Sequence, residues 1–123
     1  MAYEVLVVED SAAMRSFIAS TVEEIEGVAV TEAESGFQAL KELPRGNFDL
    51  IITDINMPDI NGLELIRFIR ENEKYKETPL IIVSTESSQR DRERGLALGA
   101  NAYLVKPFTP AALKEAVSRY IKD

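Results

Sequence analysis

The segment LIITDINMPDINGLELI, residues 50–66, holds the pattern on which the fold depends. It begins with a short apolar run, Leu50 to Ile52, and ends in a stretch whose apolar residues recur at helical spacing. Pro58 and the pair Asn61-Gly62 mark a turn between the two. A buried strand, a turn and an amphipathic helix in this order indicate one part of a repeating β-α unit.

The same alternation continues in both directions from this segment. Runs rich in Val and Ile predict five strands, at Val5 to Val8, Val28 to Val30, Leu50 to Ile52, Leu80 to Val83 and Tyr103 to Val105. The runs are almost continuously apolar, which is typical of parallel strands that helices cover on both faces. We therefore predict an α/β fold with a doubly wound, five-stranded parallel sheet.

The crossover segments carry the signals of helices. Met14, Phe17, Ile18, Val22 and Ile25 fall close to one helical face, as do Leu63, Leu65, Ile66 and Ile69. Ser11 and Ser35 are suited to cap helix starts, and Thr109 followed by Pro110 predicts an N-cap with proline at the first helical position.

Length and composition bound the function. A chain of 123 residues, with 46% apolar and 28% charged residues, predicts one globular domain over residues 1–123. The formal net charge of −7 argues against direct binding to nucleic acid or to an anionic membrane surface. No apolar run is long enough to span a bilayer, and the start does not resemble a signal peptide, so we expect a cytoplasmic protein.

The residue types that are absent are also informative. The chain has no cysteine, which excludes disulfides and thiolate metal sites. It has no histidine, which excludes catalytic histidine mechanisms and a role as a phosphohistidine donor. Any metal site must therefore rely on oxygen ligands.

Polar residues follow the strands at the points where the strands end. Glu9 and Asp10 follow the first run, Asp54 ends the third, Ser84 ends the fourth and Lys106 ends the fifth. The carboxyl ends of parallel strands lie along one edge of the sheet, where ligands bind in open α/β folds. These side chains are therefore predicted to share one pocket.

The expected pocket suits phosphoryl chemistry. Three crowded carboxylates need a cation to coexist at neutral pH, and an oxygen-only cluster favours Mg²⁺. A carboxylate held there can attack phosphorus and form an aspartyl phosphate, while the metal and Lys106 neutralise the transferred oxygens. The hydroxyl of Ser84 can donate to a phosphoryl oxygen.

Four blocks of sequence resemble the signature blocks of bacterial response-regulator receiver domains, in particular the single-domain, CheY-like kind. The blocks are VLVVEDSAAMR (5–15), LIITDINMPDINGLELI (50–66), PLIIVSTESS (79–88) and GANAYLVKPF (99–108). Their order and spacing agree with the family over residues 3 to 121. The resemblance implies a flavodoxin-like, three-layer α/β/α fold with strand order 2-1-3-4-5.

The resemblance also assigns roles at the expected pocket. Asp54 matches the phosphoacceptor, Asp10 the direct Mg²⁺ ligand, and Glu9 an acidic position that acts on the metal through water. Asn56 matches the residue whose backbone carbonyl binds the metal. Glu9 stands where aspartate is commoner in the family.

Further positions match the parts of the family that respond to phosphorylation. Ser84 matches the hydroxyl residue that turns towards the phosphoryl group, and here it replaces the commoner threonine. Lys106 matches the lysine that contacts that group, and Tyr103 matches the aromatic residue that changes rotamer. Pro107 matches the proline that follows a cis peptide bond.

The implied function is a two-component, chemotaxis-type signalling switch and not an enzyme with a separate substrate. A histidine kinase or phosphotransfer protein is the implied donor, and a downstream protein is expected to bind the fourth helix, fifth strand and fifth helix. The main alternative is a pseudo-receiver that binds proteins without being phosphorylated. A phosphatase predicts an Asp-x-Asp pattern after the first strand, and an FMN carrier predicts a Ser/Thr/Gly-rich loop there; Glu9-Asp10-Ser11-Ala12 fits neither.

Overall fold

A computed structural model describes residues 2–121, apart from the side chain of Glu86. Five strands form one parallel sheet in the order β2-β1-β3-β4-β5. Their bounds are Tyr3–Val8 for β1, Val28–Ala33 for β2, Leu50–Asp54 for β3, Leu80–Thr85 for β4 and Ala102–Lys106 for β5. The predicted strands and strand order are confirmed.

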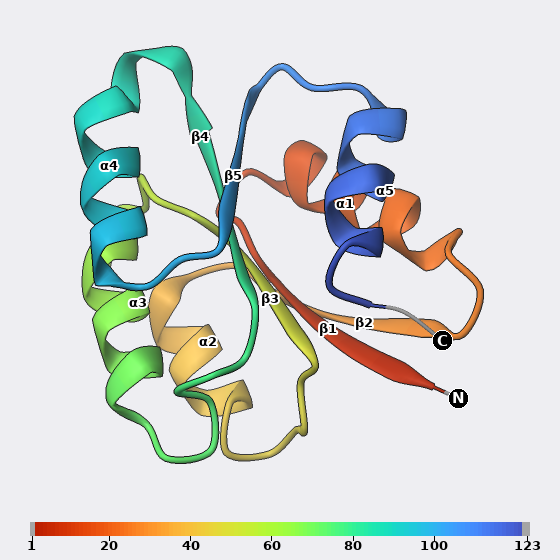
Figure 1. The fold of residues 1–123 in the computed structure, drawn as a ribbon, viewed down its shortest axis with the longest axis horizontal. Helices are drawn as coiled ribbons and strands as arrows, with labels where there is room; N and C mark the ends of the chain where they lie inside the picture. The colour runs from red at the N-terminus through yellow and green to blue at the C-terminus, as the bar shows by residue number, and fades with distance from the viewer. Residues whose placement is uncertain (1, 122–123) are drawn as a thin grey trace.

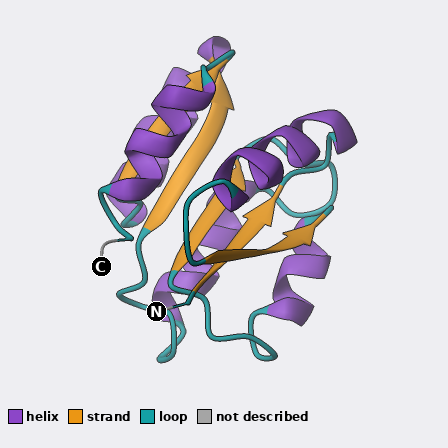
Figure 2. Cartoon of the chain, turned by 90° about the vertical axis from the view of Figure 1, so that its right-hand side faces the viewer, coloured by secondary structure: helices purple, strands orange, loops and turns teal. Residues whose placement is uncertain are grey.

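Helices connect the strands and cover both faces of the sheet. They are α1 (Ala12–Glu23), α2 (Gly36–Glu42), α3 (Gly62–Glu71), α4 (Gln89–Leu98) and α5 (Pro110–Ser118), with a short 3₁₀ turn, η1 (Glu86–Ser88), before α4. Helices α1 and α5 lie on one face, and α2, α3 and α4 lie on the other (Figures 1 and 2). The predicted three-layer α/β/α architecture is therefore confirmed.

Two apolar cores lie on the two sides of the sheet. Side chains alternate along β1, so that Val5 and Val7 enter the core beneath α1 and α5 while Leu6 and Val8 enter the other. Every residue of β3 is buried, whereas the edge strands β2 and β5 are half-exposed. Each fully buried aliphatic side chain contributes roughly 1.5–3 kcal/mol, which makes the central strands the most stable support for a site.

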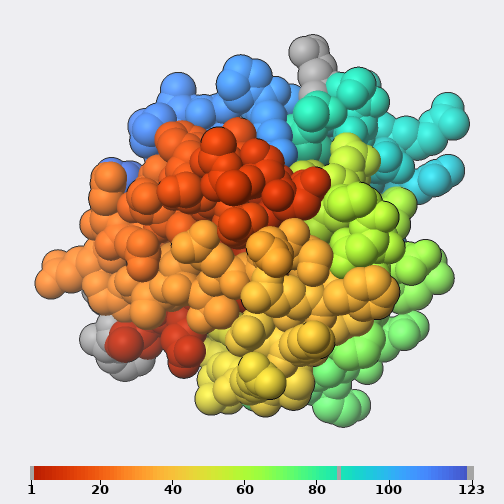
Figure 3. Space-filling model, turned by 180° about the vertical axis from the view of Figure 1, so that it is seen from behind, coloured from red at the N-terminus to blue at the C-terminus, as the bar shows by residue number. Residues whose placement is uncertain are grey.

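Helix starts follow the predicted capping signals. Ser11 Oγ accepts from the Met14 N–H, Ser35 Oγ accepts from the Gln38 N–H, and Thr109 Oγ1 accepts from the Ala112 N–H. Pro110 occupies the first helical position of α5. The space-filling view from behind shows that the N-terminal half of the chain, red to yellow, covers most of that face (Figure 3).

The start of α3 lies unusually close to the end of β3. The Gly62 N–H donates to the Ile55 carbonyl at 2.9 Å. A Cβ at residue 62 would lie 2.5 Å from the Ile55 Cα and 2.6 Å from the Asp54 carbonyl oxygen, a space that only glycine can occupy without displacement. Gly62 therefore fixes the loop that follows Asp54. No helix among residues 2–121 is long and apolar enough to cross a membrane.

Candidate functional site

Three carboxylates meet at the carboxyl ends of β1 and β3. Glu9 and Asp10 follow β1, Asp54 ends β3, and one oxygen from each lies within 4.8 Å of the others. Glu9 and Asp54 are 1% and 5% exposed, whereas Asp10 is exposed to solvent. The crossovers from β1 leave in opposite directions along the sheet at this point, which is where open α/β sheets bind ligands.

Lys106 reaches the cluster from the end of β5. Its Nζ donates to Glu9 Oε1 at 2.8 Å and to Asp54 Oδ2 at 3.3 Å. Burial lowers the pKa of Lys106, but the hydrogen bond from Lys106 to Glu9 and the charges of Asp54 and Glu9 outweigh it, so that this pKa is raised. The ammonium group is therefore held firmly in its charged form.

The carboxyl group of Glu9 responds differently to the same environment. Burial raises the pKa of Glu9 to about 7, although the hydrogen bond from Lys106 acts in the opposite direction. The Ser11 N–H donates to Glu9 Oε2 at 3.0 Å, and Arg15 Nη1 donates to the Glu9 carbonyl at 2.9 Å. These contacts orient Glu9, and the part played by Arg15 was not predicted from the sequence.

The loop after β3 orients Asp54. The Asn56 N–H donates to Asp54 Oδ1 at 3.0 Å, which fixes one face of the carboxylate. The Asn56 side chain turns towards η1, where its Nδ2 donates to Ser88 Oγ at 2.7 Å. Ser88 was not predicted as a site residue, because nothing in its local sequence indicates a contact with a loop 32 residues away.

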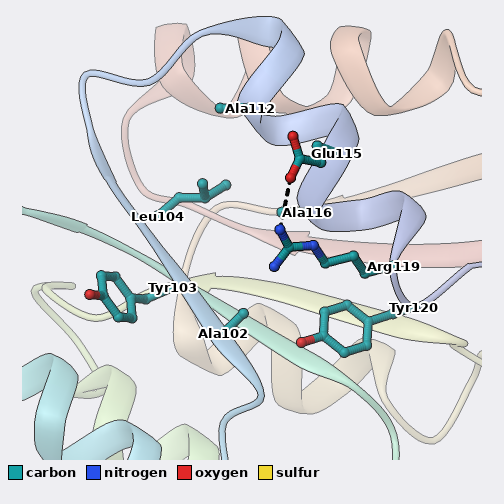
Figure 4. A pocket seen from close by; sticks show the side chains of 8 residues that line it. All are labelled: Ala102, Tyr103, Leu104, Ala112, Glu115, Ala116, Arg119 and Tyr120. Carbon is teal, nitrogen blue, oxygen red and sulfur yellow. Dashed lines mark hydrogen bonds and ion pairs between the residues drawn. The ribbon is translucent and has the colours of Figure 1, made fainter.

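Ser84 and Tyr103 lie on neighbouring strands beside this cluster. Ser84 is fully buried at the end of β4, and its Oγ accepts from Arg92 Nη1 at 3.3 Å. Among the described residues, no hydrogen bond joins the Ser84 hydroxyl to Asp54 or Lys106. Tyr103 on β5 is 48% exposed. Its ring lies on the opposite side of β5 from the α5 residues Arg119 and Tyr120 (Figure 4).

The predicted site residues are thus found in one region, and one backbone prediction is confirmed. The peptide bond between Lys106 and Pro107 is cis. Arg92 was not singled out at the site, because it belongs to the charged run QRDRERG, residues 89–95, which has the composition of a solvated helix.

The cluster fits a hard divalent cation. Glu9, Asp10 and Asp54 provide carboxylate oxygens, and Lys106 is the one cation hydrogen-bonded to them among the described side chains. An oxygen-only donor set with surplus negative charge at an accessible edge suits Mg²⁺, which retains several waters and takes one or two carboxylates. The exposed Asp10 leaves such a cation open to solvent and to a phosphoryl group.

Comparison with known proteins shows the family to which this chain belongs. The response regulator receiver domain model matches residues 5–118. Chemotaxis protein CheY1 of Helicobacter pylori is 41% identical over 113 residues, which cover 91% of this chain and 91% of that protein. The chain is therefore a member of the response-regulator receiver domain family, a class of signalling switches, and it is of the single-domain, CheY-like type.

Solved structures support the same assignment. The chemotaxis response regulator CheY4 of Vibrio cholerae superposes with a TM-score of 0.90 at 36% identity, covering 98% of this chain and 100% of that one. The receiver domain of sensor histidine kinase PA1611 from Pseudomonas aeruginosa gives a TM-score of 0.87 at 32% identity, covering 98% of each chain. That receiver domain holds a magnesium ion coordinated in its active-site cleft.

Proposed function

We propose that this chain, acting as a single domain, is a phosphoacceptor switch in which Asp54 receives a phosphoryl group in the presence of Mg²⁺. The observation that carries the proposal is the cluster of Glu9, Asp10 and Asp54, whose oxygens lie within 4.8 Å and to which Lys106 is hydrogen-bonded. Such a cluster places a carboxylate nucleophile beside a cation site and a fixed ammonium group.

The proposed donor is a phosphohistidine of a sensor kinase or a phosphotransfer protein, since this chain has no histidine of its own. An Asp54 carboxylate oxygen forms a bond to phosphorus while the phosphorus–nitrogen bond of the donor breaks. The electron pair of the broken bond stays on the imidazole nitrogen of the donor. Lys106, 3.3 Å from Asp54 Oδ2, is placed to neutralise an oxygen of the transferred group.

Four residues are proposed to hold the metal. Asp10 and Asp54 bind it directly, the Asn56 backbone carbonyl supplies a third ligand, and Glu9 acts through water. When bound, Mg²⁺ supplies charge neutralisation for the phosphoryl oxygens. Asn56 also keeps the Asp54 carboxylate oriented through its N–H, which leaves the other carboxylate oxygen facing Lys106.

Phosphorylation is proposed to change protein binding through Ser84 and Tyr103. The added charge and acceptor oxygens attract the Ser84 hydroxyl to the phosphoryl group, and Tyr103 then changes rotamer. Both residues adjoin the face formed by α4, β5 and α5, where we place the downstream protein. A cavity of about 200 Å³ between β5 and α5, lined in part by Tyr103, Glu115 and Arg119, offers a recess on that face (Figure 4).

The cellular role proposed is chemotaxis-type, two-component signalling in the cytoplasm, because relatives that match along most of this chain are chemotaxis proteins. With a net charge of −7, the chain is suited to act through a protein partner and not by direct contact with DNA or a membrane.

The test is the intact mass of the wild type after incubation with a small phosphodonor such as acetyl phosphate, with Mg²⁺ or with EDTA. We expect one phosphoryl group on the wild type with Mg²⁺ only, and none on Asp54→Ala. The matched control is Asp49→Ala, which removes a carboxylate far from the cluster, hydrogen-bonded to the Glu4 N–H, and should remain a full acceptor. A folded, Mg²⁺-binding wild type that stays unmodified would favour the pseudo-receiver alternative.

A further inference from the structure

Arg92 is a buried cation outside the carboxylate cluster, and it contacts both residues of the proposed switch. It lies on α4 with only 8% of its surface exposed. Arginine side chains this deeply buried are rarely left without a carboxylate partner. Among the described side chains, however, none forms an ion pair with Arg92. Its position must therefore be explained by its other contacts.

The guanidinium of Arg92 holds the end of β4. Nη1 donates to the Thr85 carbonyl at 2.6 Å and to the Ser84 hydroxyl oxygen at 3.3 Å. The close packing of α4 brings Arg92 within reach, because Gly95, one turn later, allows the helix to approach Ile82. A Cβ at residue 95 would lie 2.3 Å from Ile82 Cδ1. The contact between Arg92 and Ser84 is thus fixed by the packing of α4 on the sheet.

The same guanidinium contacts Tyr103. The guanidinium carbon of Arg92 lies 5.4 Å from the centre of the Tyr103 ring, within the range of a cation–π contact. This contact stabilises Tyr103 in the half-exposed position that it occupies here. Arg92 therefore favours the observed position of both Ser84 and Tyr103.

We infer that Arg92 is a positioning residue that holds Ser84 and Tyr103 in the resting arrangement and so opposes activation. The inference rests on the proposed function, since it concerns the response to a phosphoryl group at Asp54. For the Ser84 hydroxyl to turn towards that group, its hydrogen bond with Arg92 must break. Arg92 thus sets how much of the protein reaches the activated arrangement without phosphorylation.

The test uses beryllofluoride, a mimic of the phosphoryl group, added to the full chain with Mg²⁺. Arg92→Met keeps the aliphatic stem in the core and removes the guanidinium. We expect the variant to bind beryllofluoride roughly tenfold more tightly than the wild type, equivalent to about 1.4 kcal/mol. Bound ligand is measured by ¹⁹F NMR, and the ring signals of Tyr103 should move towards their beryllofluoride-bound positions before any ligand is added.

Two further variants separate positioning from a purely structural role. Arg67→Met removes an exposed arginine from the neighbouring helix α3 and should bind beryllofluoride as the wild type does. In a Ser84→Ala background, the gain from Arg92→Met should shrink, because the acceptor of the hydrogen bond is absent. Arg92→Lys keeps the charge but not the planar fork, and it should give an intermediate gain.

The outcomes distinguish this inference from the proposed function. Tighter binding by Arg92→Met and by Arg92→Lys, with Arg67→Met unchanged, supports the role of Arg92. Equal or weaker binding by the folded Arg92 variants overturns it while the wild-type response still stands. If Arg92→Met does not fold, Arg92→Lys decides between these results. A wild type that fails to bind beryllofluoride with Mg²⁺ overturns the proposed function, and the inference is refuted with it.

Discussion

Burial of Glu9 predicts that the protein loses stability as pH rises when divalent cations are absent. The pKa of Glu9 is 4.5 in the reference state and about 7 in the folded protein, so the folded state binds this proton more tightly. Between these pH values the folded state carries more protons than the unfolded state, and the free energy of unfolding must fall as pH rises. The contribution is fully present below pH 4.5 and is lost as pH passes through about 7.

The size of the effect follows from the same two values. At 1.36 kcal/mol for each tenfold change in proton affinity, the loss amounts to about 3 kcal/mol. The assay is urea denaturation at pH 4.5 and pH 8 in EDTA, for the wild type and for Glu9→Gln. The other carboxyl groups are the same in both proteins, so the difference between the two pH dependences isolates Glu9.

We expect the wild type to lose about 3 kcal/mol more than Glu9→Gln over this interval. Saturating Mg²⁺ should restore much of the wild-type stability at pH 8, because a cation bound to the folded state stabilises it. Equal pH dependence in the two proteins would refute the argument that burial and the carboxylate cluster dominate the environment of Glu9.

Three other predictions test separate parts of the structure. Gly62→Ala places a Cβ 2.5 Å from the Ile55 backbone and should cost about 1–3 kcal/mol in urea denaturation, whereas Glu64→Ala, at an exposed position of α3, should stay within about 0.5 kcal/mol. Lys106→Met removes the ammonium from the carboxylate cluster, so Mg²⁺ should bind more tightly in calorimetric titration while phosphorylation by a small donor slows; Lys114→Met, on α5, should change neither. Asp59→Ala deprives the Gly36 and Phe37 N–H groups of their acceptor at the start of α2 and should cost about 0.5–2 kcal/mol at neutral pH. Hydrogen bonding from Phe37 lowers the pKa of Asp59, so this cost should shrink below pH 4; an unchanged wild-type-to-variant difference there would contradict it.

The fold was predictable because its signals are local and repeated. Continuous apolar runs identify the central strands, and Ser11, Ser35 and Thr109 mark helix starts through contacts three residues away. The strand ends were less predictable. β2 continues past Val30 to Ala33 through Thr31 and Glu32, because ladder pairing with β1 includes polar residues that an apolar pattern does not detect.

The cluster of site residues was also predictable, because parallel strands bring their carboxyl ends to one edge. This rule places Glu9, Asp54 and Lys106 together without any knowledge of their contacts. The supporting contacts were not predictable, since they join segments distant in sequence. Asp59 caps α2 from more than twenty residues away, and Arg92 turns inwards from a helix whose composition indicates solvent.

The most direct test of the account is chemical identification of the residue that carries the phosphoryl group. After phosphorylation with Mg²⁺, borohydride reduces an acyl phosphate to an alcohol, which converts a phosphorylated aspartate to homoserine. Peptide mass spectrometry then locates the homoserine. The account predicts homoserine at position 54 of the wild type, dependent on Mg²⁺, and at no other aspartate. Homoserine at Asp10 or elsewhere, or at no position in a protein that binds Mg²⁺, would contradict it.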